Sequence, residues 1–256
     1  MECYKMKAIL YICHGSRLKA AKEEAVAFIT SCMNRVEASI QEICFLELAS
    51  PTIDEGFRTC VKRGATEIIV IPVFLLAAGH VKKDIPFELE KLNNQYPSIK
   101  VTYGNPFGVS EALIKSVYSG SGIEQENKNE VTLLLVARGS SDPEVLRDIN
   151  WIASLFQKEE KIKKVEVCYL AAAEPKFEEK LKEVVERKEK NIVVLPYLLF
   201  TGLLMKHIEK EVRQYELDEI KISPYLGKNE AFQYMLIQKT KKLLKGDQYV
   251  STYSAS

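Results

Sequence analysis

The chain has 256 residues, of which 46% are hydrophobic and 28% charged, and its formal net charge is +1. This length accommodates one large domain or two of ordinary size, and the composition is typical of a globular protein with a substantial core. A net charge near zero gives no overall attraction to nucleic acid, and no apolar run approaches the roughly 18 residues of a membrane span. We therefore expect neither nucleic acid nor a membrane as a partner.

Cysteine spacing and the N-terminal residues both favour a cytoplasmic protein. The six cysteines include no CxxC pair, so the sequence predicts neither a zinc ribbon nor an iron–sulfur cluster, and reduced, buried thiols are expected. The N-terminal stretch MECYKMKAILYICHG contains a short apolar run but no small-residue cleavage site, which is unlike a signal peptide.

Short apolar strands alternate with helical patterns along the chain. In the first half, strands are predicted at 7–13, 42–48, 67–73 and 99–104, and helices at 18–36, 53–62, 83–96 and 109–118. In the second half, the same pattern returns with strands at 131–137, 163–170, 191–197 and 219–225. Such alternation predicts an α/β fold built from βαβ units, with parallel sheets that helices cover on both faces.

The second half of the chain repeats the first. The landmarks recur in the same order: Gly15-Ser16 with Gly139-Ser140, Pro51 with Pro175, 68–85 with 191–208 after a one-residue deletion, and 108–114 with 227–233. An internal repeat of this kind predicts two similar lobes related by duplication. We place the N-terminal lobe at 1–119 and the C-terminal lobe at 131–246, with a Gly/Ser-containing and then highly polar linker at 119–130.

Two of the three histidines and one glutamate follow strands of the first half. His14 ends the first strand, Glu47 lies near the end of the second, and His80 follows the third. Ligands of open α/β folds bind beyond the carboxyl ends of parallel strands. We therefore expect these three side chains on one rim of one sheet.

The second copy contains none of these three side chains. Its aligned residues are Arg138, Ala171 and Leu203, so the scaffold is duplicated and the chemistry is not. A histidine needed only for packing has no obvious reason to be kept in one copy alone, which favours a functional role in the N-terminal lobe. The third histidine, His207, aligns with Asp84 on the following helix, and an ordinary helix-surface role is expected for it.

Two imidazoles and a carboxylate on one rim suit two kinds of chemistry. They are suitable ligands for a divalent transition metal. An unperturbed imidazole has a pKa of about 6.5 and accepts protons near neutral pH. Without a third histidine or a thiolate, the site is expected to hold metal loosely, as a protein that passes metal on requires.

The motifs around these residues resemble those of the class II chelatases. They are CHGSR after the first strand, ELASP after the second and PVFLLAAGHVKKDIP after the third, and the resemblance covers the whole chain with its duplication. This family inserts a divalent metal into the tetrapyrrole sirohydrochlorin without ATP. The resemblance implies two chelatase-like lobes with the active site in the cleft between them. It also implies catalytic histidines in the N-terminal lobe, at positions that His14 and His80 match, with Glu47 matching an acidic residue placed with them.

The resemblance gives these residues roles. His14 and His80 are expected to bind the metal and to accept the two pyrrole protons, and Glu47 to orient an imidazole or relay protons. Either histidine can be the ligand or the base. The metal is a substrate in this interpretation, Fe²⁺ or else Co²⁺ or Ni²⁺, and no permanently bound cofactor is expected.

Sirohydrochlorin is rich in carboxylates, so cationic groups and N–H donors are expected around the site. The candidates for substrate binding are Ser16, Arg17, Lys82, Arg138 and Ser140, together with Lys206. Both serines are expected beside helix N-termini, which favour anions. Arg138 occupies the position that His14 has in the first copy.

Several functions remain as alternatives. The chain lacks the histidine-rich stretch and the C-terminal cysteine motif of long cobalt chelatases, which favours the iron enzyme of siroheme synthesis over a cobaltochelatase of cobalamin synthesis. A non-catalytic metal or tetrapyrrole carrier would use the same residues, and turnover distinguishes it from an enzyme. A histidine phosphatase is set aside because Cys13 stands where that chemistry needs an arginine. A monomer is expected because two lobes in one chain resemble a fused dimer.

Overall fold

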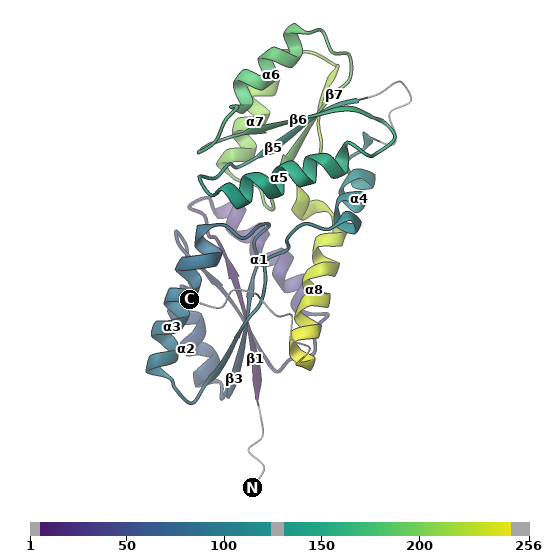
Figure 1. Cartoon of the computed structure of the whole chain (residues 1–256). Helices are drawn as coiled ribbons and strands as arrows, with labels where there is room; N and C mark the ends of the chain where they lie inside the picture. The colour runs from purple at the N-terminus through teal and green to yellow at the C-terminus, as the bar shows by residue number, and fades with distance from the viewer. Residues whose placement is uncertain (1–5, 124–130, 247–256) are drawn as a thin grey trace. The chain divides into compact units, whose positions relative to one another are not determined.

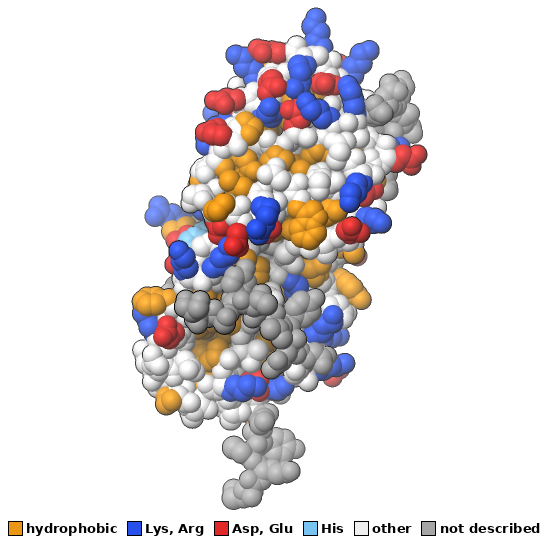
Figure 2. Space-filling view, in the orientation of Figure 1, with side chains coloured by type: hydrophobic (Ala, Val, Ile, Leu, Met, Phe, Trp, Pro, Cys, Tyr) orange, Lys and Arg blue, Asp and Glu red, His pale blue; other side chains and the backbone are white. Residues whose placement is uncertain are grey.

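The computed structural model describes residues 6–123 and 131–246 of the chain. The chain divides into two compact units, which are Met1–Gly108 with Gln233–Ser256, and Val109–Phe232. In each unit helices lie on both faces of a sheet (Figure 1). Basic and acidic side chains are interspersed on the face shown in Figure 2, in keeping with the net charge of +1.

The first unit contains a parallel four-stranded sheet in the order β2-β1-β3-β4. Its strands are β1 (Lys7–Cys13), β2 (Ile40–Phe45), β3 (Glu67–Pro72) and β4 (Lys100–Tyr103). Its helices are α1 (Lys19–Met33), α2 (Ile53–Lys62), the short π-helix η1 (His80–Asp84), α3 (Ile85–Gln95) and, from Gln233 on, α8 (Glu230–Lys245).

The centre of this sheet is β1, which is buried on both faces. On one face, Leu10 belongs to a core cluster with Phe57 of α2 and Leu89 of α3. On the other face, the side chain of Tyr11 lies beside the fully buried Thr240 of α8, and its hydroxyl group donates to Gln41 Oε1 over 3.2 Å. A strand covered on both faces needs a continuous apolar run, which explains why 8–13 contains no polar side chain other than that of Tyr11.

The second unit contains a parallel sheet in the matching order β6-β5-β7-β8. Its strands are β5 (Val131–Ala137), β6 (Ile162–Tyr169), β7 (Ile192–Tyr197) and β8 (Ile220–Ile222). Its helices are α4 (Glu111–Gly120), α5 (Pro143–Phe156), α6 (Phe177–Glu186), α7 (Leu203–Arg213) and the short 3₁₀ helix η3 (Leu226–Lys228). The predicted α/β class and the duplication are confirmed by the equal strand order of the two sheets.

The compact units do not coincide with the two sequence repeats, because the last helix of each repeat belongs to the other unit. Helix α4 ends the first repeat and lies in the second unit, where Asn229 donates to the carbonyl of Ser116 over 2.8 Å. Helix α8 ends the second repeat and lies in the first unit, where Lys7 donates to the carbonyl of Leu244 over 2.6 Å. The ranges 1–119 and 131–246 thus describe the duplicated sequence, whereas each unit is completed by a helix of the other repeat. Repetition shows the order of the elements, but not which sheet a terminal helix covers.

The ends of several elements differ from the sequence prediction. Strand β2 ends at Phe45, so Glu47 lies in the turn beyond it. The helix predicted at 83–96 begins earlier, with His80 as the first residue of η1. Helix α4 extends to Gly120 and takes the first two residues of the linker predicted at 119–130, of which 124–130 lie outside the described residues.

The cysteines are as the sequence analysis predicts. Cys13, Cys32, Cys44, Cys60 and Cys168 are free and buried, and Cys3 lies outside the described residues. Burial raises the pKa of the Cys168 thiol to about 12, which keeps it protonated and unreactive. Within 6–123 and 131–246, no helix combines the length and the apolar character that crossing a bilayer requires.

Candidate active site

The three candidate catalytic residues lie just beyond the carboxyl ends of strands in the first unit. His14 directly follows β1, Glu47 comes two residues after β2, and His80 opens η1 after β3. The pairing of β1 with β2 continues past the sheet, because the N–H of Glu47 donates to the carbonyl of His14 over 3.0 Å. Glu47 is thereby fixed beside His14.

A glycine makes this close approach possible. Gly15 has a φ of +97°, and a Cβ at this position would lie 1.8 Å from the carbonyl oxygen of Glu47. In the second unit Gly139 repeats the geometry, with a φ of +89° and a Cβ position 1.8 Å from the carbonyl oxygen of Ala171. The tight turn therefore belongs to the duplicated fold, while the histidine and glutamate side chains belong to the first copy alone.

The side chains of His14, Glu47 and His80 form one cluster. Each offers a ligand atom, and these atoms lie within 4.8 Å of one another. The imidazole rings of the two histidines are 5.1 Å apart between centroids and stand edge to face at 88°. Across the part of the chain that the structure describes, no other group of His, Cys, Asp or Glu side chains meets this criterion for a metal site.

The cluster is partly open to solvent. The exposed fractions of the side chains are 29% for His14, 44% for Glu47 and 35% for His80. A metal ion can therefore enter and leave, and it keeps room for ligands that the protein does not supply. Phe74 gives the cluster an apolar side, with its ring centroid 6.3 Å from that of His14.

Neighbouring groups select which ring nitrogens face the cluster. His80 Nδ1 lies 2.7 Å from Oδ2 of Asp84, one helical turn away, so this nitrogen carries the proton of a hydrogen bond and Nε2 keeps its lone pair. His14 Nδ1 lies 3.2 Å from the carbonyl of Gly15, and His14 Nε2 lies 3.3 Å from Oε1 of Glu47. With Nδ1–H donating to Gly15, His14 Nε2 and Glu47 Oε1 are two acceptors that face each other. Such a pair is stabilised by a proton or a cation between them.

Ser16, Arg17 and Lys82, predicted to bind substrate, lie in the segments around this cluster. The N–H of Leu18 donates to Ser16 Oγ over 3.1 Å, so the hydroxyl shapes the loop before α1 rather than capping that helix. Arg17 is exposed in the same loop, and Lys82 is partly buried in η1, two residues after His80.

The other predicted residues, Arg138, Ser140 and Lys206, belong to the second unit and are described within it. Arg138 is exposed directly after β5, and Lys206 is exposed on α7. Ser140 Oγ accepts from the N–H of Asp142 over 3.0 Å, and Asp142 caps α5. As in the first unit, the serine hydroxyl is used by the loop.

His207 of α7 forms ion pairs with two carboxylates, and one of these pairs connects α7 with α6. Its Nε2 lies 2.5 Å from Oε1 of Glu178 on α6, and its Nδ1 lies 3.8 Å from Oε1 of Glu211 on α7. Burial opposes ionisation of Glu178, but hydrogen bonds from its own N–H and from His207 outweigh it and lower the pKa of this carboxyl group. These contacts place the histidine on a helix surface, and its structural role stays a prediction.

Asp84 and Phe74 contact the cluster but are not among the residues that the sequence analysis selects. For Asp84 the sequence contains a signal, because His80 and Asp84 stand four residues apart and meet on one helical face. This spacing indicates a contact only if the helix begins at His80, and the sequence pattern predicts that it begins at residue 83. For Phe74 the sequence contains none, because an aromatic residue after a buried strand is typical of a core.

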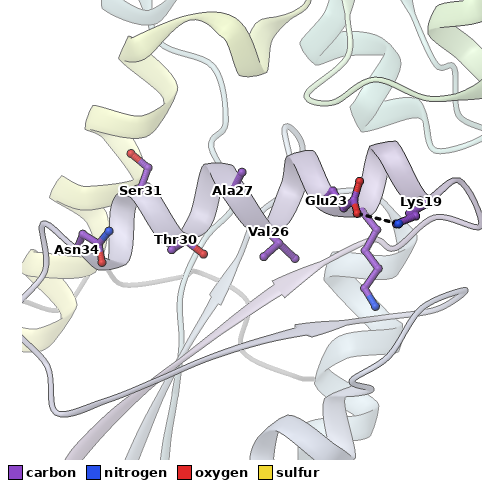
Figure 3. Close-up of a pocket in the computed structure, with 8 residues that line it drawn as sticks. Lys19, Glu23, Val26, Ala27, Thr30, Ser31 and Asn34 are labelled. Carbon is purple, nitrogen blue, oxygen red and sulfur yellow. Dashed lines mark ion pairs between the residues drawn. The ribbon is translucent and has the colours of Figure 1, made fainter.

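A surface groove runs along α1 but does not contain the cluster. Figure 3 shows the side chains of this helix that line it, from Lys19 to Asn34, including the ion pair of Lys19 with Glu23 at 3.6 Å. Most of the other lining residues are small or uncharged, such as Ala27 and Ser31. The chemistry therefore places the candidate active site at the three-residue cluster.

Comparisons with known proteins agree with this fold and its duplication. A family model described as CbiX matches the chain twice, over residues 8–121 and 132–243. A sirohydrochlorin ferrochelatase of Priestia megaterium is 45% identical over 249 residues, which cover 95% of this chain and 94% of that protein. A sirohydrochlorin cobaltochelatase of the same organism is 34% identical over 256 residues, covering 96% of this chain and 83% of that protein.

Among solved structures, SirB from Bacillus subtilis with Fe³⁺ matches with a TM-score of 0.81 and 40% sequence identity. The match covers 92% of this chain and 94% of that chain. The family model matches both repeats, and the relatives extend over nearly the full length of the chain. The chain therefore belongs to the CbiX family.

Proposed function

We propose that the protein is a sirohydrochlorin ferrochelatase, which inserts Fe²⁺ into sirohydrochlorin to give siroheme without ATP. The observation that carries this proposal is the cluster of His14, Glu47 and His80 at the carboxyl rim of one sheet. Membership of the CbiX family and the Priestia megaterium ferrochelatase at 45% identity support the same reaction.

Metal insertion exchanges the two pyrrole N–H protons of the ring for one divalent cation. The site must therefore deliver a partly dehydrated metal and also remove protons. His80, oriented by Asp84 through a 2.7 Å hydrogen bond, presents Nε2 as a metal ligand. His14 and Glu47, 3.3 Å apart, provide a second ligand and a pair that accepts protons as the metal leaves. We assign metal delivery to His80 and proton transfer to His14 with Glu47.

The ligand atoms of the cluster suit a metal ion that is bound for a short time and then passed to the substrate. Two imidazoles and one carboxylate leave coordination positions open, and the side chains are 29–44% exposed. The ring nitrogens can take these positions in turn while the protein ligands release the metal. We therefore expect the metal to be a substrate and no resident cofactor to be needed.

Charged and polar groups from the motif loops of both repeats are proposed to bind the carboxylates of the ring. Ser16, Arg17 and Lys82 would act from the first unit, and Arg138 and Ser140 from the second. Bidentate guanidinium–carboxylate pairs and charge-assisted hydrogen bonds are suited to this substrate. Arg138, which replaces His14 in the second copy, is the strongest candidate of the second unit.

A sirohydrochlorin cobaltochelatase is the second candidate. Imidazole and carboxylate ligands accommodate Co²⁺ as well as Fe²⁺, and the cobaltochelatase of Priestia megaterium is 34% identical to this chain. The higher identity to the ferrochelatase, 45%, favours iron.

Anaerobic insertion assays with Fe²⁺ and with Co²⁺ test the proposal through the visible spectrum of sirohydrochlorin. We expect many insertions per protein molecule with Fe²⁺, at rates well above the spontaneous reaction, and a lower rate with Co²⁺. A faster rate with Co²⁺ would support the cobaltochelatase. Stoichiometric binding without turnover would instead leave a carrier of metal or tetrapyrrole.

We further propose a monomer of the cytoplasm without nucleic-acid or membrane partners. Light scattering should then give the mass of one chain, 29.1 kDa. Protein dialysed against a chelator should regain full activity when only Fe²⁺ is added.

A further inference from the structure

Lys239 of α8 is a partly buried cation bound to backbone carbonyl groups of its own unit. Its ammonium group donates to the carbonyl of Pro106 and, over 2.9 Å, to that of Phe107. Burial lowers the pKa of this ammonium group to about 8, so the fold holds the charge away from water. Pro106 and Phe107 are buried themselves, and buried carbonyl groups need such donors.

The segment that Lys239 binds is attached to the loop that leads to His80. The N–H of Phe107 donates to the carbonyl of Phe74, and the N–H of Gly108 donates to that of Leu75, each over 2.8 Å. The ring of Phe74 lies beside that of His14, at 6.3 Å between centroids. A continuous series of contacts therefore runs from Lys239 to one wall of the cluster and to the segment before His80.

The second unit keeps the backbone part of this arrangement and lacks the lysine. There the N–H of Leu226 donates to the carbonyl of Leu198 over 2.9 Å, as Phe107 does to Phe74. The offset of 119 between Gly108 and Gly227 aligns Lys239 with Gly120. A Cβ at Gly120 would lie 2.9 Å from Nδ2 of Asn229, so a side chain at this position would have to displace the Asn229 amide. As with the two histidines, the lysine occurs in the unit that holds the cluster.

We propose that Lys239 is a positioning residue for metal insertion, holding the loop between Phe74 and His80 in place through the carbonyl groups of Pro106 and Phe107. The proposal rests on the proposed function. When the ammonium group is removed, the two carbonyl groups lose their donor and the attached loop gains freedom. The ring of Phe74 and the imidazole of His80 then no longer keep their separation from His14. Metal affinity and turnover depend on that separation, because both ligands must reach the same ion.

Lys239→Met tests this role, with Lys241→Met as the matched control on the exposed side of the same helix. We measure Co²⁺ binding from its visible absorption, kcat and KM for metal insertion, and the circular dichroism spectrum. For Lys239→Met we expect about tenfold weaker Co²⁺ binding and about tenfold lower kcat, with an unchanged KM for sirohydrochlorin and an unchanged circular dichroism spectrum. Lys239→Arg, which keeps a charged donor, should recover most of the Co²⁺ affinity, and Lys241→Met should match the wild type.

Wild-type Co²⁺ affinity and kcat in Lys239→Met would overturn the proposal. A general loss of folded structure in Lys239→Met would also overturn the proposal if Lys239→Arg restored the fold but not the Co²⁺ affinity. Lys239 would then only hold α8 against the rest of its unit. A wild-type protein that binds Co²⁺ but inserts no metal would contradict the proposed function and leave the positioning role to be decided by the Co²⁺ affinities of the variants.

Discussion

The imidazole of His80 is oriented by Asp84, whose Oδ2 lies 2.7 Å from Nδ1 one turn along the same helix. A carboxylate in this place fixes the tautomer and the orientation of the ring, which leaves Nε2 as the metal ligand. His14 is held differently, by the carbonyl of Gly15 on one side and by Glu47 on the other. The two histidines are therefore not equivalent, which supports different tasks for them.

Asp84→Asn tests this difference at a single side chain. The amide keeps the size of the carboxylate and removes its charge, so we expect Co²⁺ affinity and kcat/KM for insertion to fall by about 10- to 100-fold. Glu90→Gln is the matched control, because Glu90 is an exposed carboxylate of the same helical segment. Equal Co²⁺ affinities in the two variants would show that Asp84 does not orient the metal ligand.

The catalytic candidates themselves could be predicted from the sequence, and their positioning partner could not. His14, Glu47 and His80 each follow a recognisable apolar strand, and the duplication shows that their side chains are special to one copy. Asp84 matters only through a helical turn that starts at His80, whereas the helix was predicted from residue 83. The difference arises at Pro86, which has no N–H to donate and favours an irregular first turn, here the π-helix η1.

At the scale of elements, the turns after β1 and β5 place the backbone of Gly15 and Gly139 against the carbonyl groups of Glu47 and Ala171. Gly15→Ala and Gly139→Ala each place a methyl group 1.8 Å from a carbonyl oxygen at positive φ. We expect both variants to lose at least about 1 kcal/mol of unfolding free energy, measured by denaturant unfolding. Gly15→Ala should in addition lose Co²⁺ binding, because it displaces Glu47 from His14. If Gly139→Ala weakened Co²⁺ binding equally, the separation of fold and chemistry between the two copies would be wrong.

Strand β6 and helix α6 are joined by a buried carboxylate with basic partners. Glu166 forms ion pairs with Lys164 at 2.9 Å and Lys180 at 3.4 Å, and with Arg187. Burial alone would raise the pKa of Glu166, but the hydrogen bonds and charges of Lys164 and Arg187 outweigh it and hold the pKa below the usual value. The folded state therefore binds this proton less readily than the unfolded chain.

A lowered folded-state pKa stabilises the protein above the pKa of the unfolded carboxyl group, and this stabilisation is lost as the pH falls. We expect Glu166→Gln to lower the unfolding free energy by about 2 kcal/mol at pH 7 and by much less near pH 3, where the wild-type carboxylate is also being protonated. Denaturant unfolding at both pH values measures the difference. A pH-independent difference would mean that the charge of Glu166 contributes nothing.

At the scale of the whole molecule, one duplicated fold carries one candidate site. The number of strands and their succession along the chain could be predicted, because buried parallel strands are continuous apolar runs and the repeat aligns them twice. Their order within each sheet, β2-β1-β3-β4 and β6-β5-β7-β8, was not predicted. The sequence does not show which unit α4 and α8 belong to, because both are amphipathic helices and no sequence feature indicates which sheet each one covers. This exchange has a functional consequence in our account, since it supplies Lys239 to the unit with the cluster.

The central claim is that metal insertion depends on His14 and His80 of the first unit and not on the third histidine of the chain. The measurement that tests it most directly is the multiple-turnover rate of Fe²⁺ insertion into sirohydrochlorin under anaerobic conditions, for His14→Ala, His80→Ala and His207→Ala beside the wild type. We predict rates near the spontaneous reaction for the first two variants. His207→Ala should keep the wild-type rate, because His207 contacts only Glu178 and Glu211 among the ion pairs of the described residues. Wild-type turnover in His14→Ala or His80→Ala would contradict the account.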